Sequence, residues 1–230
     1  MIIRHFLTWI GNARVSERVA AASALSRAFL NHELPFEERC EAEAALTLLL
    51  DDPSPKVRAA LSEALSMSMQ APPQIVAALA ADQDDVAEWV LVRSPVLNDA
   101  DLIDRVAAAS GRMQALIASR ARISMSLAAA IAEVGELDAC LALARNDGAR
   151  IASLSYRRLV ERFGHDAALR EALMGDANLP GECRHMLLVK LGEVLREAPL
   201  VRALMGERRA ERVTKDACMR ASLTLIEHAP

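Results

Sequence analysis

The chain has 230 residues and a net charge of −4, with 53% apolar, 25% charged and only 3% aromatic residues. These proportions are typical of a globular protein and exclude collagen and intrinsic disorder. Because aromatic residues are scarce and alanine is abundant, the core must be built from closely packed Ala- and Leu-rich helices. Nine glycines and nine prolines are too few for an all-β domain, and the net charge gives no bulk basic character that would point to nucleic acid.

The N-terminal stretch, MIIRHFLTWIG, is a poor match to a secretory signal because charged residues interrupt its short apolar run. We expect its apolar side chains to form a capping helix over the first core layer rather than an interfacial membrane anchor. These side chains are Phe6, Leu7, Trp9 and Ile10. No window approaches the roughly 18 apolar residues of a spanning helix, so no membrane partner is expected.

Four cysteines are widely spaced and form no C-x-x-C pair: Cys40, Cys140, Cys183 and Cys218. In a chain of this length without a secretory signal, this pattern predicts buried, reduced thiols rather than a disulfide framework. We therefore expect a cytoplasmic protein.

Four segments repeat one pattern, in which an acidic or Asn-containing turn precedes a β-branched anchor and a helical apolar stripe. The anchors are Val57, Val86, Ile123 and Ile151, at spacings of 29, 37 and 28 residues. The longer interval predicts one extra helical piece, which we place at residues 111–119.

The stops and caps along the chain divide each unit into two short helices. Asp52 and Ser54 can cap a helix whose apolar stripe runs from Val57 to Leu65. Proline at position 72 then stops this helix because proline cannot continue the hydrogen-bond ladder.

Later units follow the same logic. Asn98 or Asp99 can cap the next helix, and Gly135 and Gly164 end the helices that follow the third and fourth anchors. A last, more polar helix is expected over residues 207–228.

Sustained alternation of period two is missing, so the sequence predicts essentially no sheet. A two-helix unit of about 30 residues cannot bury its apolar faces alone and must stack on its neighbours. We therefore predict an all-α, HEAT-like α-solenoid of about five antiparallel helix pairs, capped at both ends. The expected single domain spans residues 1–230, with an N-terminal cap over 1–30, repeats over 31–197 and a C-terminal helix over 198–230.

Several stretches resemble known families. The segment DDPSPKVRAAL, residues 51–61, is similar to the intra-repeat turn of HEAT repeats. A series over about residues 30–195 resembles the bacterial family called domain of unknown function 2336. Its members here are D-x-D-D-V-A (82–87), RSPVLNDADL (93–102), IASR (117–120), NDGARI (146–151) and NLP (178–180). The resemblance implies a HEAT-like helical protein of alphaproteobacterial type and supplies no activity.

Active-site signatures are missing from the sequence. It contains no phosphate-binding glycine loop and no G-x-S-x-G elbow, and its five histidines are dispersed. Cys183 and His185 lie two residues apart and would point to different faces of a helix, so we predict no metal and no cofactor. The sequence leaves open a Ser-His-Asp catalytic triad, because the residues of such a triad come together only in the folded protein.

The rival class is an enzyme, namely a HEAT-like nucleic-acid repair protein of the DNA glycosylase type. That chemistry needs an acidic residue beside aromatic side chains and a basic groove. We expect Trp89 to pack in the core. Tyr156 lies off the apolar stripe that starts at Ile151 and includes Leu154, so we expect Tyr156 to be partly exposed.

Charge is unevenly distributed along the chain. Residues 31–110 carry five basic and fifteen acidic residues, whereas residues 111–170 carry nine basic and six acidic residues. Opposite fields on one molecule could drive self-association, so a homo-oligomer is one hypothesis. Only three of the 27 basic residues are lysines, and the guanidinium fork suits ion pairing or recognition.

The helix after each acidic turn is expected to line the concave groove of the solenoid. The cations at positions off the apolar stripes are the candidate binding residues: Lys56, Arg122, Arg150, Arg157 and Arg158. We expect Arg122, Arg150 and Arg157 to form an unpaired stripe for an acidic or phosphorylated protein partner. The alternative is a solvated face with intramolecular ion pairs. Arg58 and Arg120 are expected to be structural, with Arg58 paired to an adjacent acidic turn.

These observations favour an interaction scaffold or regulator that binds a protein in its groove over an enzyme. Nucleic acid is not expected as a partner. The residues do not identify the partner or its pathway.

Overall fold

The structure is a computed structural model that describes residues 8–31 and 34–227. It is helical along its length, and the described residues form no strand beyond one isolated parallel bridge between Ile123 and Ala149. The all-α prediction is therefore confirmed. Phe6 and Leu7 lie outside the described residues, and Trp9 is exposed.

The chain divides into two compact units, residues 1–120 and 121–230, each of which is described here by itself. The first contains α2 (Val15–Asn31), α3 (Phe36–Leu49), α4 (Pro55–Leu65), α5 (Pro73–Ala80), α6 (Asp84–Arg93), α7 (Asp99–Ala108) and α8 (Gly111–Ala118). The second contains α9 (Met125–Val134), α10 (Leu137–Ala144), α11 (Ser153–Phe163), α12 (Ala167–Gly175), α13 (Gly181–Glu197), α14 (Pro199–Met205) and α15 (Glu207–Glu227).

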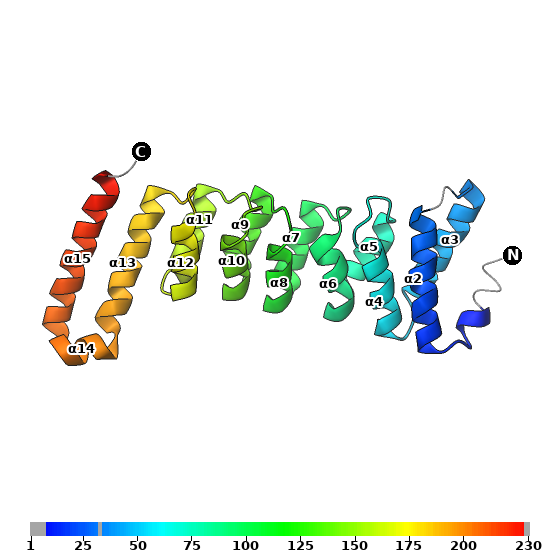
Figure 1. The fold of residues 1–230 in the computed structure, drawn as a ribbon, viewed down its shortest axis with the longest axis horizontal. Coiled ribbons are helices and arrows are strands. Elements are labelled where there is room, and N and C mark those ends of the chain that lie inside the picture. The colour runs from blue at the N-terminus through cyan, green and yellow to red at the C-terminus, as the bar shows by residue number, and fades with distance from the viewer. Residues whose placement is uncertain (1–7, 32–33, 228–230) are drawn as a thin grey trace. The chain divides into compact units, whose positions relative to one another are not determined.

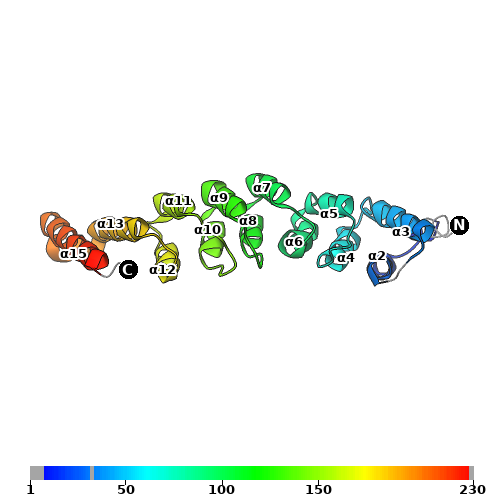
Figure 2. The same ribbon diagram turned by 90° about the horizontal axis from the view of Figure 1, so that it is seen from above.

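Helices of the first unit form two layers (Figures 1 and 2). Helices α2, α4, α6 and α8 follow one another in one layer, and α3, α5 and α7 lie in the other. The apolar faces meet between the layers, where Val57, Leu61, Leu65 and Ile75 are fully buried. The predicted extra piece is α8, so two helices, α7 and α8, lie between the second anchor and the third, whereas only α5 lies between the first anchor and the second.

The second unit repeats this layered packing. Helices α9, α11 and α13 follow one another, while α10 packs on both α9 and α12 (Figure 2). The short helix α14 joins α13 to α15, which lie side by side (Figure 1). Gly206 makes the turn into α15 with φ 72° and ψ 155°, a backbone conformation that is essentially restricted to glycine.

Two Arg–Asp forks join neighbouring helices of the first unit. Nε and Nη2 of Arg58 on α4 donate to the two carboxylate oxygens of Asp82, at 2.6 and 3.0 Å, in the turn before α6. Its Nη1 also donates to the Asp52 carbonyl at 2.6 Å. Arg18 on α2 makes the same fork with Asp52, at 2.7 and 3.1 Å. The predicted structural role of Arg58 is therefore confirmed.

Other arginines donate to backbone carbonyls at the ends of neighbouring helices. Arg120 donates to the carbonyls of Leu91 and Ser94, the latter at 2.7 Å, which confirms its predicted structural role. In the second unit, Arg162 donates to the carbonyls of Ala132 and Gly135 at 2.7 and 2.8 Å. These carbonyls have no partner within their own helix, so the guanidinium supplies the missing hydrogen bonds.

The apolar stripe predicted for α11 is wrong at the start of the helix, although Leu159, which also belongs to the predicted stripe, is buried. Leu154 is 77% exposed, whereas Tyr156, Leu159 and Val160 are buried. The reason is that Ile151 precedes the helix, which begins at Ser153, so a helical period counted from Ile151 has the wrong phase. None of the described helices combines the length and apolar character needed to cross a bilayer.

Replacing Arg58 with Lys should reduce the free energy of unfolding by about 1 kcal/mol, because an ammonium cannot donate to Asp82 and to the Asp52 carbonyl in this fork geometry. Chemical denaturation measures the change. Arg150→Lys is the matched control, since Arg150 is exposed. Equal stability of the Arg58→Lys variant and the wild type would contradict a structural role for the fork.

Stability should also depend on pH through Asp82. Burial of this carboxyl opposes its ionisation, but hydrogen bonds from Arg58 and from the Gln83 N–H and the charge of Arg58 outweigh burial, so the pKa of Asp82 is lowered. A lowered pKa in the folded state stabilises the protein above the ordinary carboxyl pKa of about 4, and this stabilisation is lost as the pH falls through the folded value. The stability difference between the wild type and Asp82→Asn should therefore shrink below about pH 4. A difference that stays constant across this range would rule out the linkage.

Candidate functional site

The starts of α9 and α11 are held side by side by main-chain hydrogen bonds. The Ile123 N–H donates to the Gly148 carbonyl at 3.2 Å, and the Arg150 N–H donates to the Ile123 carbonyl at 2.9 Å. Gly148 permits this approach, because a Cβ atom there would lie 2.1 Å from the Ala121 carbonyl oxygen. The buried Ile123 side chain anchors the pair to the core.

Arg122 and Arg150 lie next to this bridge, and both are exposed. Side chains alternate along an extended segment, so Arg122 points away from the buried Ile123. Among the described residues, neither arginine makes a salt bridge or donates a side-chain hydrogen bond. The structure therefore brings these two predicted binding residues together, as the repeat pattern indicated.

Two exposed apolar side chains, which sequence reasoning missed, stand at the same two helix starts. Met125 is the first residue of α9 and is 49% exposed, and Leu154 is the second residue of α11 and is 77% exposed. We call Arg122, Met125, Arg150 and Leu154 the α9–α11 surface. The signal in the sequence was the pairing of each arginine with an apolar residue three or four positions later.

The unpaired stripe does not extend along α11. Arg157 lies 3.1 Å from Glu161 and 3.6 Å from Glu182, and Arg158 lies 2.8 Å from Glu133. The prediction that Arg157 is unpaired is wrong, because α11 and its neighbours supply carboxylates to this face. Exposed ion pairs of this kind contribute little to stability.

Lys56 is exposed near the start of α4 and belongs to the first unit, whereas the four candidate arginines belong to the second. The repeat positions are also different. Val57 and Val86 lie within α4 and α6, each of which is the second helix of a pair. Ile123 and Ile151 precede α9 and α11, each of which is the first helix of a pair. Of the five predicted binding residues, the bridge between α9 and α11 therefore joins only Arg122 and Arg150.

The aromatic side chains considered for base recognition have partners within the protein. Tyr156 is buried rather than partly exposed, and its hydroxyl donates to the carboxylate of Asp176. Burial, followed by the hydrogen bond and the charge of Asp176, raises the pKa of Tyr156. Trp89 is half-buried, with the guanidinium carbon of Arg93 at 4.7 Å from the centre of its ring.

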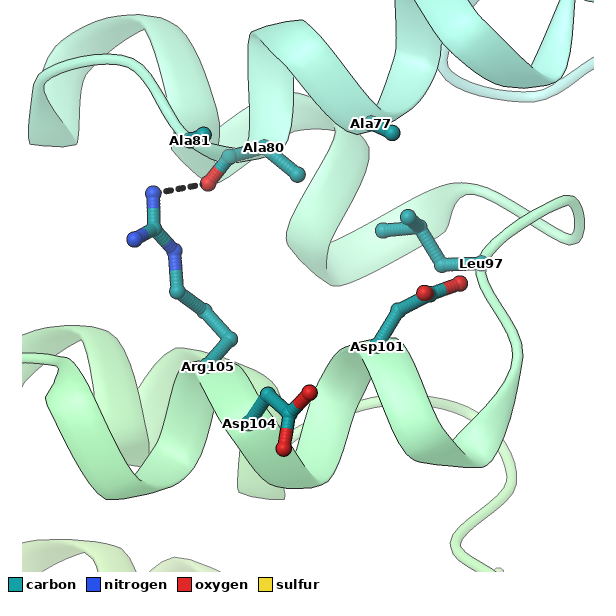
Figure 3. A pocket seen from close by; sticks show the side chains of 7 residues that line it. All are labelled: Ala77, Ala80, Ala81, Leu97, Asp101, Asp104 and Arg105. Atoms are coloured by element: carbon teal, nitrogen blue, oxygen red, sulfur yellow. Dashed lines mark hydrogen bonds between the residues drawn. The ribbon is translucent and has the colours of Figure 1, made fainter.

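A cavity of about 250 Å³ lies beside α7 in the first unit (Figure 3). Its walls are Ala77, Ala80, Ala81, Leu97, Asp101, Asp104 and Arg105. Arg105 donates to the Ala80 carbonyl, as Figure 3 shows, and Asp101 completes the capping box of α7 with Asn98. Two polar side chains that line the cavity, Asp101 and Arg105, therefore already make hydrogen bonds within the fold.

A larger cavity, of about 500 Å³, lies in the second unit between the end of α10 and the end of α12. Asp176 lines it and accepts hydrogen bonds from Tyr156 and from the Asn178 N–H. This carboxylate therefore stabilises the turn after α12. Across the described residues, no three His, Cys, Asp or Glu side chains converge in a way that could hold a metal ion.

The four thiols are free, but they differ in exposure. Cys140 and Cys183 are buried, Cys218 is half-buried, and Cys40 is exposed, so the prediction of burial is wrong for Cys40. Burial raises the pKa of Cys140 to about 11, even though the nearby Arg162 opposes this shift. A thiol with such a pKa stays protonated at neutral pH and is a weak nucleophile.

The fold defines an all-α protein whose short helices pack in two layers within each unit. Residues 86–229 match the family described as "Uncharacterised protein conserved in bacteria (DUF2336)", and the chain belongs to this family. The match begins later than the resemblance predicted and includes the C-terminal helices, which the quoted motifs did not reach. No curated protein and no solved structure matches the chain.

Tyr156 is the only tyrosine, so its ionisation can be followed directly by the absorbance of the phenolate. We expect the midpoint to lie well above the ordinary tyrosine pKa of about 10 while the protein is folded. Because the folded-state pKa is raised, stability should be lost as the pH rises above about 10. A midpoint near 10 in folded protein would contradict the buried contact with Asp176, and Tyr156→Phe supplies the baseline.

Proposed function

We propose that the chain is a cytoplasmic protein-binding module whose α9–α11 surface holds an acidic or phosphorylated segment of a protein partner. One observation carries this proposal, namely two exposed arginines held side by side with no acidic partner among the described side chains. Two neighbouring cations repel each other mildly, and an anionic ligand removes that cost. A guanidinium also binds carboxylate or phosphate through two parallel hydrogen bonds.

Met125 and Leu154 favour a ligand that presents apolar groups beside its charge, as a protein segment does, over a small anion. Arginine and methionine are enriched in the buried cores of protein–protein interfaces, and an exposed apolar side chain gains free energy when a partner buries it. Leu154 has most of its surface available for burial against a partner. The contact therefore combines charge, which sets specificity and association rate, with apolar burial, which adds affinity.

The repair-enzyme alternative has less support from the described residues. Such an enzyme needs an aromatic side chain free to stack on a base, and the hydroxyl of the buried Tyr156 is bound to Asp176.

Reversing the charge of both arginines, in Arg122→Glu/Arg150→Glu, should reduce partner capture from an extract of the native bacterium by at least about tenfold, since two charge-assisted contacts are lost. The variant should keep the melting temperature of the wild type, because exposed charges contribute little to stability. Leu154→Ser should weaken capture by a smaller factor without changing its salt dependence.

The matched control is Arg157→Glu/Arg158→Glu, which makes the same charge change on α11 at residues that already have acidic neighbours. Binding of acidic and phosphorylated peptides, measured against neutral versions, identifies the ligand chemistry. Recovery of the same partners in equal amounts by the wild type and Arg122→Glu/Arg150→Glu would refute the proposal.

A further inference from the structure

The terminal helix of the second unit has a fixed inner face. Ala210 is fully buried, and the Cys218 thiol lies 3.4 Å from the Leu188 carbonyl of α13. Gly192 of α13 lets the two helices approach, because a Cβ atom at that position would lie 2.5 Å from the Cys218 sulfur. These contacts set the rotation of α15 about its own axis, and therefore which residues it turns outward.

The outer face of α15 combines cations with apolar side chains. Its members follow one another at intervals of three or four residues, so they share one side of the helix: Arg208, Arg212, Lys215, Met219 and Leu223. All five are exposed, with Met219 and Leu223 at 58% and 57%. Arg209 and Arg220 flank this face and are also exposed.

These cations have no acidic partner within the described part of the unit. Salt bridges of the second unit join residues of α9, α11 and α13, and none reaches a basic residue of α15. At the helix period of 3.6 residues, Glu207 and Glu211 fall on the side of Cys218, near the inner face. Asp216 is the described acidic residue of α15 closest to the outer face, and it is half-buried. The outer face therefore carries three cations, Arg208, Arg212 and Lys215, against one bordering carboxylate, Asp216, and is cationic.

Further apolar side chains are exposed where α14 leads into α15. Leu200 and Leu204 lie one turn apart on α14 and are 70% and 75% exposed. Gly206 holds α14 next to the start of α15, beside Arg208 and Arg209. Exposed leucines and exposed arginines thus occur close together where α14 leads into α15.

We propose that the outer face of α15, together with Leu200 and Leu204, docks onto an anionic phospholipid bilayer. A helix that lies in a membrane interface presents Lys and Arg to the headgroups and inserts apolar side chains between them. The charge of the face complements an anionic leaflet. The exposed Met and Leu side chains distinguish a lipid surface from nucleic acid, which is bound mainly through phosphates and stacked bases.

This docking differs from crossing the membrane. A helix that spans a bilayer needs about 20 consecutive apolar residues, whereas an interfacial helix needs one cationic and partly apolar side. The proposal is independent of the α9–α11 surface, because the two surfaces share no residue.

The experiment measures sedimentation of the full chain with vesicles of phosphatidylcholine alone or mixed with phosphatidylglycerol. The wild type should bind the mixed vesicles and not the neutral ones. Arg212→Glu/Lys215→Glu should weaken this binding by at least about 30-fold, since each lost cation near an anionic surface reduces affinity several-fold. Met219→Ser/Leu223→Ser keeps the charge and should weaken binding by about tenfold, through lost apolar insertion.

The control Arg157→Glu/Arg158→Glu makes the same change in net charge as Arg212→Glu/Lys215→Glu, at residues that already have acidic neighbours, and should bind vesicles like the wild type. Hydrogen exchange of the unaltered chain gives a second measurement, in which mixed vesicles should slow the amides of α14 and α15. Failure of the wild type to bind or to show this protection would overturn the proposal. The proposal would also be overturned if Met219→Ser/Leu223→Ser bound the mixed vesicles as well as the wild type does and DNA displaced the chain from the vesicles. That result would identify a nucleic-acid surface.

Discussion

Short helices leave many backbone carbonyls without partners, and the packing of each unit depends on how these groups are satisfied. The last four carbonyls of a short α-helix such as α5, α8 or α9 have no partner within the helix itself, and the N–H groups of the following turn bond only some of them. Burying them between layers without hydrogen bonds would be costly. Guanidinium groups of neighbouring helices donate to them, as Arg162 does to Ala132 and Gly135. One side chain therefore both satisfies a helix end and joins two helices.

This requirement accounts for the near replacement of lysine by arginine. Arg58 donates at once to both oxygens of Asp82 and to the Asp52 carbonyl, which demands a planar group with several N–H donors. An ammonium is a point charge and cannot make this set of contacts. Arginine therefore has a structural role at several helix ends, whereas Arg122, Arg150 and other exposed arginines make no such contact among the described residues.

Helix positions and their stops could be predicted from the sequence, because apolar periodicity and proline or glycine breaks are local signals. The side-chain environment on α11 could not. Its phase depends on where the helix begins, and the bridge from Ile123 to Ala149 delays that start to Ser153. The delay turns Leu154 outward and Tyr156 inward. The pairing of Arg157 with Glu182 was equally hidden, since it depends on how α13 packs beside α11.

The position of a helix within its unit decides what its cations can do. Arg162 on α11 donates to the Ala132 carbonyl of the neighbouring helix α9, and Arg184 on α13 donates to the carbonyls of Asp176 and Leu179. No helix in the described part of the unit packs against the outer side of α15, so that side meets no carbonyl or carboxylate of a neighbour. Cations and apolar side chains there have no packing role. The exposed Met219 and Leu223 and the cations beside them therefore form a surface that the described helices leave uncovered.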